Sequence, residues 1–161
     1  MIPSSFLAWP VLLEMWRVLP GPPETVWHLI TDWEHQDDWM LEARDFVITS
    51  PRREGVGVTG RATVRIGGIT TTDEVVVTGW DPGRRLAVEH KGWVSGEAEM
   101  LLAELEDGST HILWREELIC RSLGAVGSIG LALFRPLMRL IFVRDLRVLE
   151  SLVRAATRSK G

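Results

Sequence analysis

The chain has 161 residues, of which 45% are hydrophobic and 25% are charged, with a formal net charge of −4, and this balance excludes long intrinsic disorder. Its single Cys120 cannot form an internal disulfide and fits a reducing, cytoplasmic compartment. Asp and Glu are interspersed among the arginines of the strand-like segments and no aromatic-basic sheet motif occurs, so nucleic-acid binding is not expected.

The N-terminal residues 1–10 are apolar, and Arg17 is the first basic residue of the chain. A secretion signal begins with positive charge, so this segment does not fit one. We expect an apolar arm over residues 1–10 followed by one domain over residues 11–159. The length suits one domain, and no Ser/Gly-rich linker interrupts it.

The first predicted element is a strand over Leu12–Leu19, which ends at the turn residues Pro20-Gly21-Pro22-Pro23. The last two prolines open a helix, because proline lacks the N–H group that the first helical turn leaves unpaired. Apolar residues at helical spacing carry this helix to about Thr31. A second short helical turn is predicted to end near Trp39.

Six further segments have the β-branched or alternating pattern of strands. Gly67-Gly68, Asp81-Pro82-Gly83 and Asp107-Gly108 mark three of the turns between them. Connections this short join antiparallel neighbours. The predicted strands are Phe46–Ser50, Gly60–Ile66, Ile69–Trp80, Arg85–Lys91, Gly96–Leu105 and Thr110–Ile119.

Alternation along these strands assigns their faces, and the more apolar set is predicted to point inward. Two polar residues fall within otherwise apolar inward sets. His90 follows Val88 at a spacing of two, and Glu116 follows Trp114 in the same way. The strand positions expected to contact a ligand are Val64, Val75, Val77, Val88, His90, Met100, Trp114 and Glu116.

The C-terminal segment is a long apolar stretch that ends in an amphipathic helix reaching about Arg158. Pro136 predicts either a kink or a new helix start, with a lid-like segment over residues 122–134 before it. One stripe of the helix is apolar except for Asp145, and Arg147 and Arg154 lie opposite it. Its members expected to face a ligand are Phe134, Met138, Ile141, Phe142 and Asp145.

Charge is unevenly distributed, since residues 135–161 carry six Arg and one Lys against one Asp and one Glu, a net charge of +5 that leaves −9 for the remainder. Such a basic end can bind an anionic membrane surface, or it can simply face water. The apolar run 122–143 has nearly the length of a membrane span. Arg135 and Arg139 would each cost at least ~2.5 kcal/mol at the bilayer centre, so a spanning helix is not expected.

Short motifs spread over the chain carry a family resemblance. They are Pro22-Pro23-Glu24 with Val26-Trp27, then Asp32, Trp39, Gly55-Val56-Gly57, Asp81-Pro82-Gly83-Arg84-Arg85-Leu86, Gly108 with Thr110-His111-Ile112-Leu113-Trp114, and Leu149-Glu150-Ser151-Leu152. With these residues the chain resembles the polyketide cyclase/dehydrase and lipid-transport family of the START-like (SRPBCC) superfamily. The resemblance covers nearly everything after residue 11.

The resemblance implies an α+β helix-grip fold, in which a seven-stranded antiparallel sheet curves around a long C-terminal helix and two short helices lie between strands 1 and 2. It also implies a hydrophobic cavity between helix and sheet. Members of the family bind lipids or hormones, act as aromatase/cyclases, or serve as chaperone or quinone-carrying factors. Cyclase members line this pocket with Tyr, Ser and Arg. The present chain contains no Tyr, which argues against cyclisation.

The residues support three functional hypotheses. The first is the binding of a small hydrophobic ligand, which is aromatic, polyketide-like or lipidic, in the cavity. The second is an enzyme of the cyclase, dehydratase or hydrolase type with His90, Glu116 or Asp145 as general acid or base, unless these residues lie apart or pair with an arginine such as Arg135. The third is a membrane-peripheral or partner-binding module that uses the arm, residues 124–133 and the basic helix surface.

Two other patterns resemble sites that we do not expect to exist. Residues 55–60 spell the dinucleotide fingerprint G-x-G-x-x-G, but a strand rather than a helix follows. His28 and Asp32 are four residues apart on a helix, near His35, yet no metal-binding motif accompanies them. We therefore expect neither a metal nor another cofactor. The sequence does not indicate the oligomeric state or the identity of the ligand.

Overall fold

Seven β-strands, two α-helices and two short 3₁₀ helices make up the described part of the chain. The computed structural model describes residues 8–159, so residues 1–7 of the predicted arm lie outside the described part. The elements are β1 (Val11–Leu19), α1 (Pro23–Thr31), the 3₁₀ helix η2 (Trp33–Asp38), β2 (Ala43–Ile48), β3 (Thr59–Ile66), β4 (Ile69–Asp81), β5 (Arg85–Lys91), β6 (Ser95–Glu104), β7 (Thr110–Ile119), the 3₁₀ turn η3 (Arg121–Leu123) and α2 (Gly124–Arg158).

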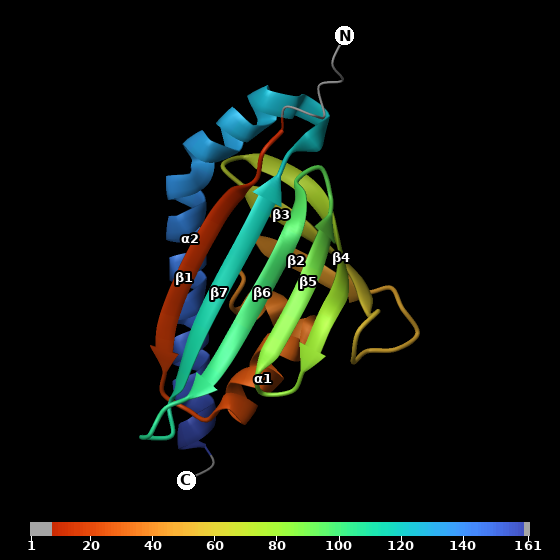
Figure 1. The fold of residues 1–161 in the computed structure, drawn as a ribbon. Helices are drawn as coiled ribbons and strands as arrows, with labels where there is room; N and C mark the ends of the chain where they lie inside the picture. Colours follow the sequence, from red (N-terminus) through yellow and green to blue (C-terminus); the bar gives the residue numbers. More distant parts are fainter. Residues whose placement is uncertain (1–7, 160–161) are drawn as a thin grey trace.

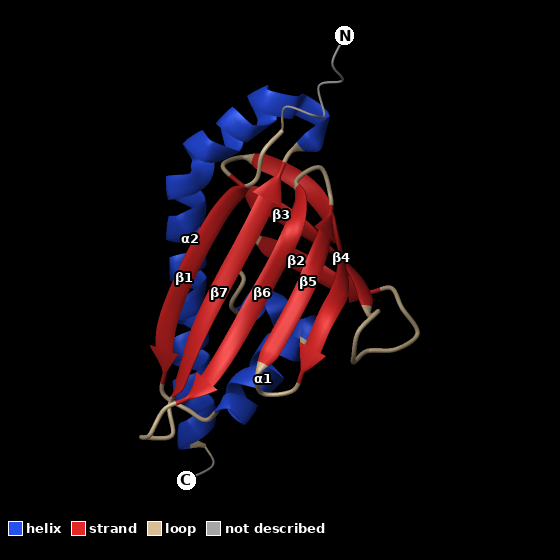
Figure 2. Cartoon of the chain, viewed as in Figure 1, coloured by secondary structure: helices blue, strands red, loops and turns tan. Residues whose placement is uncertain are grey.

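The strands form one 7-stranded sheet in the order β1-β7-β6-β5-β4-β3-β2, and every neighbouring pair is antiparallel. Figures 1 and 2 show that the sheet curls at its β2–β3 side and that α1 and α2 lie behind it. Bulges in β2 and β4, where the pairing register shifts, increase the local bend. The strand pairing, the two short helices after β1 and the long C-terminal helix confirm the predicted fold class.

One strand differs clearly from its predicted position. β2 covers Ala43–Ile48 rather than residues 46–50. Asp45 has a φ of 53°, and the register shift beside it lets Ala43 pair with Val64. Residues on the two sides of such a shift follow opposite face assignments, so alternation alone cannot locate it.

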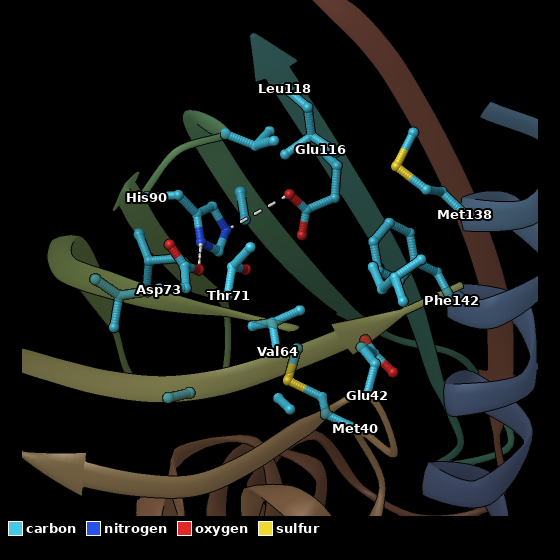
Figure 3. A pocket seen from close by; sticks show the side chains of 18 of the residues that line it. Met40, Glu42, Val64, Thr71, Asp73, His90, Glu116, Leu118, Met138 and Phe142 are labelled. Carbon is cyan, nitrogen blue, oxygen red and sulfur yellow. Dashed lines mark hydrogen bonds and ion pairs between the residues drawn. The ribbon is translucent and has the colours of Figure 1, made fainter. Parts of the chain in front are cut away.

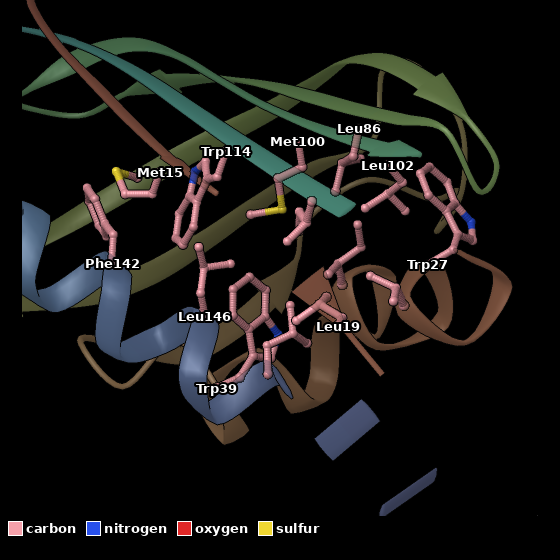
Figure 4. Packing of buried hydrophobic residues seen from close by; sticks show 14 of the residues in the cluster. Met15, Leu19, Trp27, Trp39, Leu86, Met100, Leu102, Trp114, Phe142 and Leu146 are labelled. Atoms are coloured by element: carbon pink, nitrogen blue, oxygen red, sulfur yellow. The ribbon is translucent and has the colours of Figure 1, made fainter. Parts of the chain in front are cut away.

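The core lies between the sheet and the helices (Figure 4). α1 begins at Pro23, as the prolines predict, and buries Trp27 on its inner side. The indole ring of Trp114 on β7 lies 5.8 Å from that of Trp39 and 4.9 Å from the Phe142 ring of α2, measured between ring centroids. These contacts join the sheet, the segment after η2 and α2 in one apolar cluster.

The predicted lid is not a separate segment. α2 begins at Gly124 and continues through Pro136 to Arg158. Pro136 cannot donate a hydrogen bond to the preceding turn, which permits a bend without ending the helix. Figure 1 shows the first part of α2 crossing the end of the sheet at an angle to the rest. The helix therefore does not restart at Pro136.

The second half of α2 packs one apolar side against the core, and Leu149 of the predicted stripe belongs to it, whereas Leu152 and Ala156 are only partly buried. Leu146, Leu149 and Val153 are almost completely buried, and Arg147 and Arg154 face solvent. By length and composition alone, the segment Arg121–Arg158 is long and apolar enough to cross a membrane. In this structure its second half is instead part of the packed core.

Candidate ligand-binding cavity

A cavity of about 500 Å³ lies between the concave face of the sheet, η2 and the first half of α2. This volume falls within the ~300–1,000 Å³ that is typical of small-molecule sites. Most of the lining side chains are aliphatic or aromatic. Trp33 and Trp39 contribute to the wall from η2 and the residue after it, and Trp93 contributes from the β5–β6 turn.

Most residues predicted to contact a ligand line this cavity, namely Val64, Val75, Val88, His90, Met100, Trp114, Glu116, Phe134, Met138 and Phe142. Their contact with a ligand stays a prediction. Val77, Ile141 and Asp145 are not part of the lining, so their predicted placement is wrong. Val77 is buried in the packed core at 2% exposure. Ile141 lies about 100° around the helix from Phe142 and therefore points away from the cavity. Asp145 contacts Arg144 and Glu42 instead.

The polar side chains of the cavity gather around His90 on β5 (Figure 3). His90 Nδ1 lies 2.6 Å from Asp73 Oδ2 on β4, and His90 Nε2 lies 3.6 Å from Glu116 Oε2 on β7. The indole N–H of Trp114 donates to Glu116 Oε1 over 2.8 Å and fixes that carboxylate. Three strands thus bring two carboxylates to one imidazole.

Small residues on β6 allow this convergence. β6 separates β5 from β7, and it places Gly96 opposite His90 and Ala98 opposite Glu116. A Cβ at Gly96 would lie 1.7 Å from the backbone oxygen of Glu117, so only glycine fits there. Because β6 presents almost no side chain at these positions, the longer side chains of its two neighbours meet above it.

His90 holds a proton at neutral pH. Burial by itself lowers the pKa of His90, but the hydrogen bond to Asp73 and the charge of Glu116 outweigh it and raise the pKa to about 10. The imidazolium therefore has an N–H donor on each side. The 3.6 Å separation between His90 Nε2 and Glu116 Oε2 is too long for a direct hydrogen bond.

Several polar atoms of the lining have no hydrogen-bond partner among the described residues. They are Trp39 Nε1, Asp73 Oδ1, His90 Nε2 and Glu116 Oε2. Buried polar atoms are normally paired, because an unmade hydrogen bond costs about 1–3 kcal/mol. The cavity therefore offers both donors and acceptors to a molecule that enters it.

A second polar group lies at the other side of the cavity, where Glu42 lines it near Phe142 (Figure 3). Burial, followed by the neighbouring Asp145, raises the pKa of Glu42 to about 8. Arg144 Nη2 lies 3.1 Å from Glu42 Oε2 and 2.9 Å from Asp145 Oδ1. Asp145 therefore pairs with an arginine and a carboxyl group, and it does not converge with His90 and Glu116.

Sequence reasoning missed Asp73 and Glu42. Val75, Val76 and Val77 are apolar on both faces of β4, so alternation did not extend back to Asp73, which is two residues before Val75. Glu42 lies between η2 and β2, where no regular period assigns a face. The β4–β5 register, which pairs Val75 with His90, is the signal that places Asp73 beside the imidazole.

Neither the G-x-G-x-x-G pattern nor the His28/Asp32 pair lines the cavity. The glycines at 55–60 lie in the β2–β3 loop and at the start of β3, with no helix after them. His28 is exposed and lies 3.8 Å from Glu24. Within residues 8–159, no group of three or more His, Cys, Asp or Glu side chains is arranged to hold a metal ion.

The chain is similar to known proteins in sequence family and in fold. The family model described as polyketide cyclase / dehydrase and lipid transport matches residues 11–155. No curated protein matches the chain in sequence.

Among solved structures, the protein TTHA0849 from Thermus thermophilus superposes with a TM-score of 0.76 at 21% identity, over 91% of this chain and 99% of that chain. The Zhui aromatase/cyclase from Streptomyces sp. R1128 gives 0.78 at 16% identity, over 95% and 99%. A START superfamily protein from Mycobacterium smegmatis gives 0.66 at 13% identity, over 93% and 99%. At these identities the likeness shows a common fold.

Proposed function

The chain belongs to the polyketide cyclase/dehydrase and lipid-transport family, and on that basis we propose that it binds one small hydrophobic ligand, aromatic, polyketide-like or lipidic, between α2 and the sheet. The observation that carries this proposal is the cavity of about 500 Å³, whose apolar walls enclose a few unpaired polar atoms. Such a site favours a ligand with an apolar body and one polar end.

The unpaired polar atoms of the cavity favour a hydroxyl group at the polar end of the ligand. A hydroxyl oxygen placed between His90 and Glu116 accepts from the Nε2–H group and donates to Oε2, so it satisfies both unpaired atoms at once. Trp114 keeps the other oxygen of Glu116 occupied. The site is therefore organised for a group that donates and accepts.

Charge makes a carboxylate a poor ligand at this position. The cluster has two carboxylates, Asp73 and Glu116, and one imidazolium, so it carries a net negative charge when both acids are ionised. A ligand carboxylate a few Å away would meet repulsion of about 1–4 kcal/mol. Neutral hydroxylated ligands should bind better than acids of the same length.

Calorimetric titration with two matched ligands tests this proposal. 4-Octylphenol and 4-octylbenzoate have the same apolar body and differ at the polar end. We expect the wild-type protein to bind the phenol at least about tenfold more tightly. In Glu116→Gln, the amide oxygen can still accept from Trp114 while one charge is lost, so the preference should shrink. Equal or tighter binding of the benzoate would contradict hydroxyl recognition, and failure of both ligands to bind would contradict the site itself.

A second candidate function is acid–base chemistry on a carbonyl compound in the same cavity. One observation favours it: the His90 donor and the Glu116 acceptor face one space. In that chemistry, the imidazolium donates a hydrogen bond to the carbonyl oxygen and the carboxylate removes an adjacent proton. Deuterium exchange next to the carbonyl of 4-octylacetophenone measures this directly. Exchange no faster with the wild-type protein than with Glu116→Gln would exclude it.

A further inference from the structure

The first half of α2 exposes an apolar face to solvent. Val126, Ile129, Leu133, Leu137 and Leu140 are between 40% and 76% exposed. At 3.6 residues per turn they lie on one side of the helix, opposite the side that carries Met138 and Phe142. We call these five residues the outer face. A helix whose function is only to cover a cavity needs no apolar residues on that side.

The outer face differs from the surface of an ordinary core helix. Only 22% of the most apolar 18-residue window of Arg121–Arg158 is buried. Isolated apolar residues are common on protein surfaces, but a continuous patch marks an interaction site. Two exposed tryptophans accompany it. Trp9 is held beside α2, because its backbone N–H donates to Ser128 Oγ and its carbonyl accepts from the same hydroxyl, each over 2.8 Å.

The second tryptophan, Trp93, belongs to the rim of the cavity. The rim side chains line the cavity and are also exposed, and they comprise Ile69, Trp93, Leu123, Val126 and Phe134. Val126 belongs to both the rim and the outer face. Val126 therefore joins the apolar surface outside α2 to the rim of the cavity, which gives an apolar ligand a path between the two.

Charge identifies what this surface contacts. Residues 118–144 contain Arg121, Arg135, Arg139 and Arg144 and no acidic residue. Arg144 is paired with Glu42 and Asp145. Arg139 Nη1 donates to the Glu14 carbonyl oxygen on β1 over 3.0 Å. Within residues 8–159, Arg121, Arg135 and Arg139 form no ion pair with an acidic side chain. A segment that combines exposed apolar side chains with arginines and no acidic residue matches the surface of an anionic lipid bilayer, which attracts each basic residue near it by about 1 kcal/mol.

A second copy of the chain fits less well. In a two-fold dimer the same surface faces itself, so the basic segment 118–144, which has no acidic residue, would approach its own copy. Tryptophan, present as Trp9 beside α2 and as Trp93 at the rim, is enriched where proteins meet the headgroup region of a bilayer.

We propose that the outer face of α2 docks on an anionic lipid surface, with the rim of the cavity turned toward the bilayer. The proposed docking depends only on the exposed residues of the outer face and the rim. The additional statement that the ligand passes between the bilayer and the cavity rests on the proposed function above.

Co-sedimentation with vesicles tests the docking. We expect the full chain to bind vesicles of phosphatidylcholine with about 30% phosphatidylglycerol at low salt, and to bind phosphatidylcholine alone at least tenfold less. Salt of ~0.5 M should release most of the bound protein. Leu133→Gln combined with Leu140→Gln should lower binding at least tenfold. Arg121→Gln, at an exposed arginine two residues before the rim residue Leu123, should lower it about fivefold, the equivalent of ~1 kcal/mol.

A matched control replaces two apolar residues that are also exposed but lie on β2 and the β2–β3 loop, Val47→Gln with Val56→Gln, and should bind vesicles like the wild type. Equal binding by the Leu133/Leu140 double variant, or no binding of the wild type at low salt, would overturn the proposal. A wild-type dimer in analytical ultracentrifugation that this variant abolishes would also overturn it, in favour of a second copy. Titration of the same variant with 4-octylphenol separates failure of docking from failure of the cavity.

Discussion

The two halves of α2, residues 124–142 and residues 143–158, show two different ways in which one helix can pack. In the second half, Leu146, Leu149 and Val153 are buried and Arg147, Arg154 and Arg158 face water, which is the ordinary amphipathic pattern. In the first half both sides are apolar. One side lines the cavity and the other is exposed to solvent. The second half is thus built for stability, while the first half has more apolar surface than stability requires.

This difference indicates where function is located. Residues that pack the second half leave no space for a ligand, and no residue beyond Phe142 lines the cavity. The first half lines the cavity on one side and exposes leucine side chains to water on the other, which is unfavourable. Selection for folding alone would favour polar residues at such exposed positions.

The largest expected effect contrasts two leucines of the helix. Leu149 is completely buried, so Leu149→Ala should lower the free energy of unfolding by about 3–4 kcal/mol. Leu133 is 76% exposed, so Leu133→Ala should change it by less than about 0.5 kcal/mol. Urea unfolding of both variants measures the contrast. Similar losses in the two variants would mean that the two halves do not differ in this way.

An effect of intermediate size is the pH dependence that Glu42 causes, a buried acid next to the second half of α2. The pKa of Glu42 is raised from 4.5 to about 8 next to Asp145, so the folded protein keeps a proton that the unfolded chain releases. The free energy of unfolding must then fall as pH rises from about 4.5 to about 8. His90, whose pKa is raised from 6.5 to about 10, adds a decline between those two values.

Glu42→Gln removes only the first of these declines. Relative to the wild type, the variant should gain about 2 kcal/mol in unfolding free energy between about pH 5 and pH 8, after allowance for the nearby Arg144. Urea unfolding at several pH values checks this, and the contribution of His90 cancels in the difference. A constant difference across that range would show that Glu42 is ionised in the folded protein.

The smallest expected effect compares two glycines of the first half. A Cβ at Gly130 would meet no atom within 4 Å, so Gly130→Ala should stabilise the helix by about 0.5–1 kcal/mol. A Cβ at Gly127 would lie 2.8 Å from the backbone oxygen of Cys120, so Gly127→Ala should be destabilising. Thermal unfolding should show shifts of opposite sign. A destabilised Gly130→Ala would mean that this side of the helix is packed rather than open.

Much of the fold could be predicted from the sequence because its signals are local. Alternation and turn residues located the strands, and helical spacing located α1 and the buried stripe that contains Leu149. Alternation also placed His90 and Glu116 inside. It could not locate the bulge at Asp45, which reverses the faces, or the continuation of α2 before Pro136, where residues 124–134 are apolar on every side.

The partners of the polar residues could not be predicted, because they depend on how distant elements meet. Asp145 was correctly expected to lie in an apolar stripe, but its neighbours Glu42 and Arg144 follow from the position of α2 against the segment after η2. Asp73 reaches His90 through the β4–β5 register. The cytoplasmic location suggested by the lone Cys120 and the role of the apolar arm stay predictions.

The most direct test of the central claim is whether the space between α2 and the sheet is where the ligand binds. Val64 lines the cavity from β3, and Val47 is exposed on the neighbouring β2. Calorimetric titration with 4-octylphenol should give one site per chain in the wild type and in Val47→Trp. In Val64→Trp, whose indole fills the cavity, affinity should fall at least about tenfold. Undiminished binding by a folded Val64→Trp protein would contradict the account.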